Sequence, residues 1–295
     1  MRMAIIGAGK WGQALYHAYS EKNDCVIHSR TYREIENFVS LDEALEREYL
    51  VMALPAQVVR SWLVEKFEDR GQKIVVAAKG IETETGAFLN QLYGAYLPDE
   101  RLAYISGPSF AAEVMQSLPT ALIISSHRRE LAERFAKALP HYIKGYVDDD
   151  VVGAEVSGAY KNVIAIAGGV SDGLRLGNNA RAALISRGLV EMARFGEHFG
   201  ARAETFLSLG GAGDLFLTAS STLSRNYRVG LGLAEGKEME LILEELGEVA
   251  EGVPTAYALH RIARKEALYL PIADEVHRMI EEGKDPRESV RDLLG

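Results

Sequence analysis

Residues 3–12 read Met3-Ala4-Ile5-Ile6-Gly7-Ala8-Gly9-Lys10-Trp11-Gly12. A short apolar run leads directly into glycines with the spacing GxGxxG, and a helical stretch follows over Trp11–Glu21. In such a strand–turn–helix unit, Gly7 permits the tight turn, Gly9 lets a pyrophosphate approach the backbone, and Gly12 allows close helix–strand packing. The helix N-terminus adds unpaired N–H groups and a favourable dipole for an anion. This context predicts a dinucleotide site, and the alternative is a simple glycine-rich turn.

The first half of the chain alternates β-rich runs with helical stretches. Several runs are continuously apolar, as expected for strands in a sheet with helices on both faces. The predicted strands are Met3–Ile6, Cys25–His28, Tyr49–Ala53, Lys73–Ala78, Leu102–Ser106, Ala121–Ser125 and an extended piece at Tyr142–Val147. The pattern predicts an α/β domain with a doubly wound, mostly parallel sheet of the Rossmann type.

The sequence changes character after the acidic run Asp148–Asp150. Apolar residues then recur at helical spacing, for example at Ile272, Val276, Met279 and Ile280. We therefore predict a dinucleotide-binding domain over 1–150 and an all-α domain over 151–295. The glycines at 168–169 and 210–213 are expected to interrupt long helices.

Composition excludes several classes of partner. The net charge of −9 argues against nucleic acids and membrane surfaces, whose phosphates such a protein repels. No apolar stretch approaches the roughly 20 residues of a membrane span, and the N-terminal strand leaves no room for a targeting peptide. A single cysteine, Cys25, cannot form an intrachain disulfide, and the seven histidines show no metal-ligand spacing. These features predict a cytoplasmic protein with no membrane span and no metal.

Arg30 follows the second predicted strand, where a site selective for NAD usually carries Asp or Glu. An arginine there can accommodate the 2′-phosphate of NADP, so NADP is favoured. The alternative is that Arg30 stacks on the adenine or is merely solvated.

Lys161 lies in a helical stretch of small and apolar residues, EVSGAYKN at 155–162 followed by VIAIA. A lysine on a helix is normally a solvated charge, but these neighbours predict a buried or half-buried one. Its ammonium can then donate a proton to, or accept one from, a carbonyl or alcohol oxygen.

Three other polar positions accompany this lysine. Asp214 stands in a glycine-rich turn at a helix start, where it can cap the helix, hold substrate hydroxyls or tune the lysine, and these roles can hold together. Ser224-Arg225-Asn226 suits a phosphate, because a guanidinium binds phosphate in a bidentate manner, although such a triplet is often a polar turn. Lys79 follows a buried strand at its carboxyl end, where open α/β sheets bind ligands.

Together these segments resemble the bacterial-type NAD(P)-dependent glycerol-3-phosphate dehydrogenase family. The resemblance runs in order along nearly the whole chain, and the pieces at 157–174 and 224–230 are far more specific than the glycine loop. The matching segments are GAGKWGQAL at 7–15, AAKGIETETG at 77–86, ISGPSFAAEV at 105–114, SGAYKNVIAIAGGVSDGL at 157–174, NARAALISRGL at 179–189, GGAGDLFLT at 210–218 and SRNYRVG at 224–230.

The resemblance implies a fold like that of 6-phosphogluconate dehydrogenase and the interconversion of dihydroxyacetone phosphate and sn-glycerol 3-phosphate with NAD or NADP. Lys161 would be the general acid/base for the C2 oxygen, and Lys79 and Arg225 would contact both cofactor and substrate. The other implied substrate ligands are Gly107, Ser109, Asp214, Ser224 and Asn226. The other implied cofactor contacts are Gly7, Gly9, Lys10, Trp11, Gly12, Arg30, Ala111 and Glu251.

One segment departs from the family, because the stretch from Arg30 to Leu41 is short and lacks a segment that many relatives carry. The short segment lies close to the adenosine end of the expected dinucleotide site. It therefore bears on whether the site prefers NAD or NADP, and not on the reaction. The helical domain suggests a homodimer by analogy of fold, and the implied role is supply of glycerol 3-phosphate for phospholipid synthesis. The alternatives are a related β-hydroxy acid dehydrogenase, against which Asp214 and the 224–226 triplet speak, and a dinucleotide-sensing binding protein, which would show a degraded lysine or phosphate site.

Overall fold

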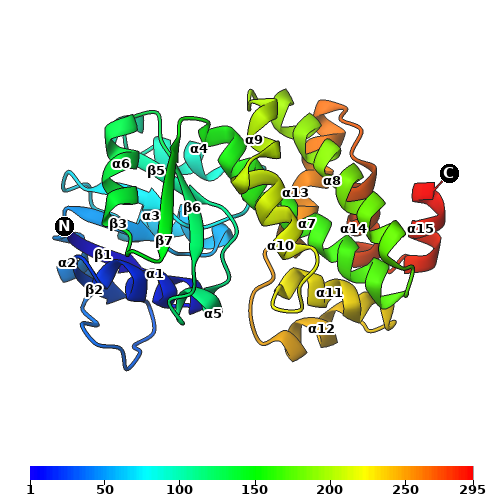
Figure 1. The fold of residues 1–295 in the computed structure, drawn as a ribbon, viewed down its shortest axis with the longest axis horizontal. Coiled ribbons are helices and arrows are strands. Elements are labelled where there is room, and N and C mark those ends of the chain that lie inside the picture. The colour runs from blue at the N-terminus through cyan, green and yellow to red at the C-terminus, as the bar shows by residue number, and fades with distance from the viewer. Residues whose placement is uncertain (295) are drawn as a thin grey trace. The chain divides into compact units, whose positions relative to one another are not determined.

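The computed structural model describes residues 1–294, which divide into two compact units. The first unit comprises residues 1–79 and 89–154, and the second comprises 80–88 and the chain from Glu155 onward. Figure 1 shows a sheet with helices in the first unit and helices throughout the second. The change from one unit to the other at Glu155 falls inside helix α7 (Val151–Gly173).

A seven-stranded sheet lies at the centre of the first unit, in the order β2-β1-β3-β4-β5-β6-β7. Neighbouring strands are parallel except for β5 and β6, which are antiparallel. The strands are β1 (Arg2–Ile6), β2 (Asp24–His28), β3 (Tyr49–Met52), β4 (Lys73–Val76), β5 (Leu102–Ser106), β6 (Thr120–Ser125) and β7 (Ile143–Asp148). The predicted Rossmann-like sheet is confirmed.

Apolar residues on both faces explain why the strands read as continuous hydrophobic runs. All four residues of β3 are buried, and so are all five of β5. Helix α1 (Lys10–Ser20) packs Leu15 and Tyr19 into the same core as Ile5 and Val51. Cys25 belongs to this core too, and burial raises the pKa of its thiol to about 11, so it acts there as a small apolar residue.

The second crossover of the sheet is mostly loop. Residues 29–40 leave β2, return to it through a single bridge between Ile27 and Phe38, and lead into the five-residue helix α2 (Leu41–Leu45). Ser40 and Glu43 form a capping box that starts this short helix. The other α-helices of the first unit are α3 (Val59–Lys66), α4 (Leu89–Gly94), α5 (Ala111–Val114) and α6 (Arg129–Ala138).

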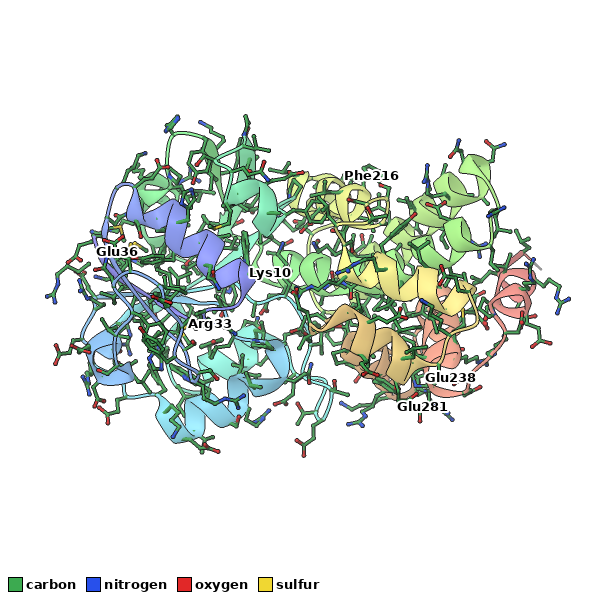
Figure 2. All side chains as sticks on the ribbon, turned by 90° about the horizontal axis from the view of Figure 1, so that it is seen from below. Lys10, Arg33, Glu36, Phe216, Glu238 and Glu281 are labelled. Atoms are coloured by element: carbon green, nitrogen blue, oxygen red, sulfur yellow. The ribbon has the colours of Figure 1, made fainter. Side chains whose placement is uncertain are left out.

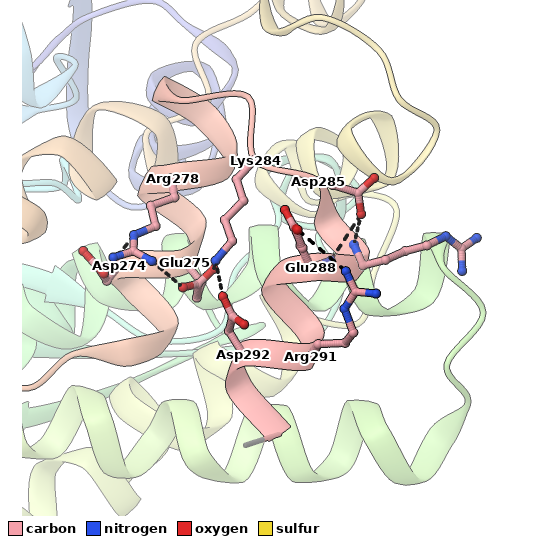
Figure 3. Close-up of polar contacts among 9 residues, drawn as sticks. Asp274, Glu275, Arg278, Lys284, Asp285, Glu288, Arg291 and Asp292 are labelled. Carbon is pink, nitrogen blue, oxygen red and sulfur yellow. Dashed lines mark hydrogen bonds and ion pairs between the residues drawn. The ribbon is translucent and has the colours of Figure 1, made fainter.

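The second unit is built from helices. They are α7, α8 (Asn178–His198), α9 (Ala203–Leu207), α10 (Asp214–Thr218), α11 (Arg225–Ala234), α12 (Met239–Leu246), α13 (Gly252–Glu266), α14 (Pro271–Glu281) and α15 (Pro286–Leu294). The four periodic apolar residues noted in the sequence all lie buried on α14. Figure 3 shows how the last helix is attached: Lys284 contacts both Glu275 of α14 and Asp292 of α15 at 2.6 Å.

The expectation that Gly168 and Gly169 break a helix is wrong. Helix α7 continues through them to Gly173, and they serve close packing instead. A Cβ on Gly169 would lie 2.0 Å from the carbonyl oxygen of Tyr227, and one on Gly230 would lie 2.0 Å from that of Ile166. The backbones of α7 and α11 therefore touch directly. The glycines at 210–213 do interrupt the helix, because a π-helical turn over Leu209–Gly213 separates α9 from α10.

No helix among residues 1–294 is long and apolar enough to cross a membrane. Over the same described residues, no group of three or more His, Cys, Asp or Glu side chains could hold a metal ion.

Candidate active site

The three fingerprint glycines have three different environments. Gly7 has a φ of +110°, and a Cβ on it would lie 2.5 Å from the carbonyl oxygen of Ala53. A Cβ on Gly12 would lie 1.8 Å from the carbonyl oxygen of Gly7, so helix α1 packs directly against the turn. Gly9 is exposed, and a Cβ there would meet open space. The second glycine thus offers accessible backbone at the start of a helix, where a pyrophosphate can approach.

The residues around this turn present a basic and aromatic edge. Gly9 is the N-cap of α1 and has no side chain to cap the first turn. Trp11 is half-buried, and its indole N–H donates to the carbonyl oxygen of Ala77 at 3.1 Å. Lys10 and, in the loop after β2, Arg33 are exposed (Figure 2). Arg30 of the same loop is exposed too. These groups fit a dinucleotide because they offer cations and uncapped N–H donors to its phosphates.

Lys79, Gly107 and Ser109 meet beyond the carboxyl ends of β4 and β5. The Lys79 ammonium donates to the carbonyl oxygen of Gly107 at 3.1 Å, and the Ser109 hydroxyl donates to the same oxygen at 3.2 Å. Gly107 has a φ of +112°, which turns the chain sharply after β5. Ala111 follows as the first residue of α5. The structure thus brings these predicted residues together at the sheet edge that binds ligands in open α/β folds.

A buried charged cluster connects α7 and α10 in the helical unit. Lys161 is 6% exposed and Asp214 is 1% exposed, and the lysine ammonium donates to a carboxylate oxygen of Asp214. Thr218, one turn after Asp214, completes the cluster: it accepts from the Lys161 Nζ at 3.0 Å and donates to Asp214 Oδ1 at 3.1 Å. The predicted burial of Lys161 is confirmed.

At this cluster the structure rules out one sequence inference and adds one residue that the sequence analysis did not predict. The capping alternative for Asp214 is wrong, because Gly213 is the N-cap of α10 and the Asp214 carboxylate points to Lys161 instead. Thr218 was missed by sequence reasoning. Its position four residues after Asp214 on a helix would have placed both side chains on one face.

Ser224, Arg225 and Asn226 form the start of helix α11. Ser224 is the N-cap and accepts from the backbone N–H of Tyr227. Arg225 is half-buried and pairs through Nη1 with Glu248 at 3.1 Å. Asn226 is buried, and its side-chain oxygen accepts from the N–H of Gly252 at 2.8 Å. The triplet is therefore an organised helix N-terminus with one half-exposed cation, rather than a polar turn.

Glu251 stands directly before helix α13 and next to this helix start. Its carbonyl oxygen accepts from both the N–H and the hydroxyl of Thr255. Gly252, which follows it, packs so closely that a Cβ would lie 2.7 Å from the carbonyl oxygen of Asn162. Glu251 is thus fixed near the residue that follows Lys161. Glu248, three residues earlier, was missed, and no local pattern marks it.

The predicted residues therefore form two sets. The glycine turn, Arg30, Lys79 and the 107–111 turn belong to the sheet unit, and Lys161, Asp214, the 224–226 triplet and Glu251 belong to the helical unit. A dinucleotide-type sheet with a helical unit that buries a lysine–carboxylate pair defines a two-domain nicotinamide-dependent dehydrogenase.

This chain belongs to the NAD-dependent glycerol-3-phosphate dehydrogenase family. The family models for the N-terminal and C-terminal parts match residues 24–132 and 150–291. The chain is 60% identical to the glycerol-3-phosphate dehydrogenase [NAD(P)+] of Sulfurimonas denitrificans over 99% of both chains. It is 58% identical to the enzyme of the same description from a Nitratiruptor species, covering all of this chain and 98% of that one.

A solved structure agrees with these relatives. The crystal structure of glycerol-3-phosphate dehydrogenase from Coxiella burnetii superposes with a TM-score of 0.91 at 32% identity, covering 99% of this chain and 98% of that one. The family resemblance seen in the sequence is confirmed, and the β-hydroxy acid alternative is not favoured.

Proposed function

We propose that this protein interconverts dihydroxyacetone phosphate and sn-glycerol 3-phosphate with NADH or NADPH, and that Lys161 is the general acid/base. The observation that carries the proposal is the buried Lys161–Asp214–Thr218 cluster, in the same unit as a helix start that presents Arg225. Burying a charged lysine costs desolvation free energy even when it is paired, and a role in proton transfer explains why a lysine stands there. The names of the close relatives give glycerol 3-phosphate as their substrate, and dihydroxyacetone phosphate is the ketone that its oxidation at C2 yields.

The residues of the sheet unit fit the cofactor. Gly9 offers open backbone at the N-terminus of α1, and Lys10, Trp11, Arg30 and Ala111 are the other contacts that we assign to the dinucleotide there. Gly7 and Gly12 shape the turn that places them. When bound, the nicotinamide supplies the hydride.

Lys161 moves the proton. In the reductive direction its ammonium at Nζ donates a proton to the C2 oxygen of dihydroxyacetone phosphate, and in the oxidative direction the neutral amine takes the proton from the C2 hydroxyl. The Asp214 carboxylate stabilises the ammonium and fixes its position, and Thr218 supplies a second fixed contact. A lysine held in this way loses little orientational freedom when the substrate arrives.

Arg225 is the proposed partner of the substrate phosphate. It stands in the first turn of α11, where backbone N–H groups and the helix dipole also favour an anion. Ser224 and Asn226 order this turn and flank the arginine. Lys79, Gly107 and Ser109 are the substrate contacts that we assign to the sheet unit, with Lys79 and Arg225 also near the cofactor. Glu251 is assigned to the cofactor.

The domain division belongs to the same proposal: residues 1–150 form the dinucleotide-binding domain, and residues 151–295 form the helical catalytic domain that carries Lys161 and Arg225. We further propose a cytoplasmic homodimer that supplies glycerol 3-phosphate for phospholipid synthesis. Large apolar side chains exposed on the helical unit support the dimer, among them Leu207 on α9 (74% exposed) and Phe216 on α10 (50% exposed; Figure 2).

One assay tests the proposed reaction. Oxidation of NADH and of NADPH is followed at 340 nm, with dihydroxyacetone phosphate as the substrate. Oxidation that depends on this substrate is expected with at least one cofactor. The proposal fails if dihydroxyacetone phosphate supports no turnover, or if a β-keto acid is reduced more efficiently.

A further inference from the structure

The loop between α12 and α13 is attached to two consecutive residues of α11. Its first attachment is the ion pair of Glu248 with Arg225, and its second is the hydrogen bond to Asn226 from the N–H of Gly252, the residue of α13 at which the loop ends. Gly247, with a φ of +62°, ends α12 just before the loop. Arg225, which we assign to the substrate phosphate, and its neighbour Asn226 therefore also hold this loop.

The two attachments differ in strength. The Asn226 contact is buried, because Asn226 is only 7% exposed and Gly252 is buried as well. The ion pair is open to water, since the side chains of Arg225 and Glu248 are 41% and 27% exposed. Exposed ion pairs are weak and exchange partners readily. Glu248 can thus leave Arg225 while the Gly252 end of the loop, with Glu251 beside it, stays in place.

A carboxylate on Arg225 stands where a phosphate would bind. The guanidinium forms a planar fork that matches carboxylate and phosphate alike. In a protein of net charge −9, a second anion beside this cation also repels an incoming dianion. Glu248 therefore opposes phosphate binding in two ways: it occupies the arginine, and it adds negative charge next to it.

We propose that Glu248 is an internal anion that competes with the substrate phosphate for Arg225 and so sets the affinity of the site for phosphorylated ligands. This inference rests on the proposed function. Binding of the phosphate exchanges the partner of Arg225, so the Glu248 carboxylate leaves the guanidinium. Substrates without a phosphate leave the pair intact, so they gain nothing from Arg225.

The test compares Glu248→Gln with Glu244→Gln by titration calorimetry with glycerol 3-phosphate and, separately, with inorganic phosphate. Glu244 is exposed on the neighbouring turn of α12, so its replacement changes the net charge equally without touching Arg225. Glu248→Gln should lower the Kd for both ligands by about three- to fivefold, the upper part of what an exposed ion pair contributes. Glu244→Gln should leave both values close to wild type, and added salt should shrink the difference.

A second comparison shows whether Glu248 acts through the arginine. In an Arg225→Ala background, Glu248→Gln should change the Kd for glycerol 3-phosphate by less than in the native background. Glu248→Ala serves as a second variant, and circular dichroism verifies that each protein is folded.

The outcomes separate the two proposals. If the wild-type protein binds glycerol 3-phosphate but Glu248→Gln and Glu248→Ala match Glu244→Gln, the role of Glu248 is refuted while the proposed function stands. If the wild-type protein binds neither ligand, the phosphate site itself is refuted, and the role of Glu248 with it.

Discussion

The ammonium of Lys161 and the carboxylate of Asp214 lie 53 residues apart in the chain and form an ion pair buried in the helical unit. When two opposite charges are buried together, removing either one leaves the other charge uncompensated and destabilises the fold. The pair therefore fixes the lysine in position, and it makes the site sensitive to the loss of either partner.

Replacing Lys161 tests the acid/base role. Lys161→Ala should lower kcat by about 10²- to 10⁴-fold, the usual contribution of a positioned acid/base group. The Kd for NADH, measured by fluorescence, should stay near wild type because the glycine turn is untouched. Turnover like that of the wild type would exclude Lys161 as the proton donor.

Replacing Asp214 tests the buried pair. Asp214→Asn keeps the shape but leaves the lysine charge without its partner, which should lower the free energy of unfolding by about 3–5 kcal/mol and impair kcat. Thr218→Val is the matched control, because it removes only one neutral side chain from the cluster and should cost about 0.5–1.5 kcal/mol. Denaturant unfolding of the two variants gives the comparison. Equal losses of unfolding free energy would show that removing the charged partner costs no more than removing a neutral one.

Arg225 should recognise the substrate phosphate. A charge-assisted hydrogen bond contributes about 1.5–3 kcal/mol, so Arg225→Ala should reduce kcat/KM at least about tenfold. Arg225→Lys should recover only part of this, because it keeps the charge but loses the planar fork. Unphosphorylated dihydroxyacetone is the control substrate, and its poor turnover should barely change. An equal loss with both substrates would argue against a phosphate contact.

Arg30 should favour NADPH. It is exposed in the loop after β2, at the position where an acidic residue would repel a 2′-phosphate. Arg30→Asp should therefore raise the KM for NADPH while leaving that for NADH nearly unchanged. Parallel kinetics with the two cofactors measure this, and equal losses would mean that Arg30 does not contact the 2′-phosphate.

The stability of the helical unit should depend on the protonation of His277. This ring is buried and stacks on His260 at 3.9 Å, and burial, followed by the charge of His260, lowers its pKa below 6.5, against the opposing effect of Asp274 and Glu281. Because the unfolded chain binds the proton more readily, the free energy of unfolding should fall as the pH drops below 6.5.

His277→Phe keeps the ring without the proton, so its stability should fall less over the same pH range. Denaturant unfolding at a series of pH values provides the measurement. His141→Phe, at a residue whose side chain is 86% exposed, is the control and should follow the wild type. A decline of equal size in His277→Phe would show that other groups control the pH dependence.

The sheet could be predicted well because each strand carries its own signal. Residues buried on both faces, such as those of β3 and β5, leave a continuous apolar run that needs no knowledge of the partner strands. The error at Gly168 and Gly169 has the opposite cause. Glycine disfavours a helix by about 1 kcal/mol locally, but the close contact with α11 decides in favour of the helix, and that contact is not visible in the local sequence.

Long-range contacts explain what the sequence did not reveal elsewhere. Residues 80–88 follow the fourth strand, yet they group with the helical unit, where the Thr83 hydroxyl donates to the carbonyl oxygen of Pro254, 171 residues away. At the site, Lys161 was recognisable because a charge stood within an apolar helix. Glu248 was not, because its importance comes only from its contact with Arg225, and an acidic residue in a loop is ordinary.

The direct backbone contact of α7 and α11 has a consequence for substrate length. Lys161 lies about two turns before Gly169 on α7, and Arg225 begins the helix that carries Gly230. With no side chains between the two helices at this crossing, the separation of the proton donor and the phosphate-binding cation is set by the polypeptide backbone. Side-chain substitutions that enlarge a pocket would leave this separation unchanged. A sugar phosphate with one more carbon between carbonyl and phosphate would then be a poor substrate, and adapting the enzyme to it would require new helix packing.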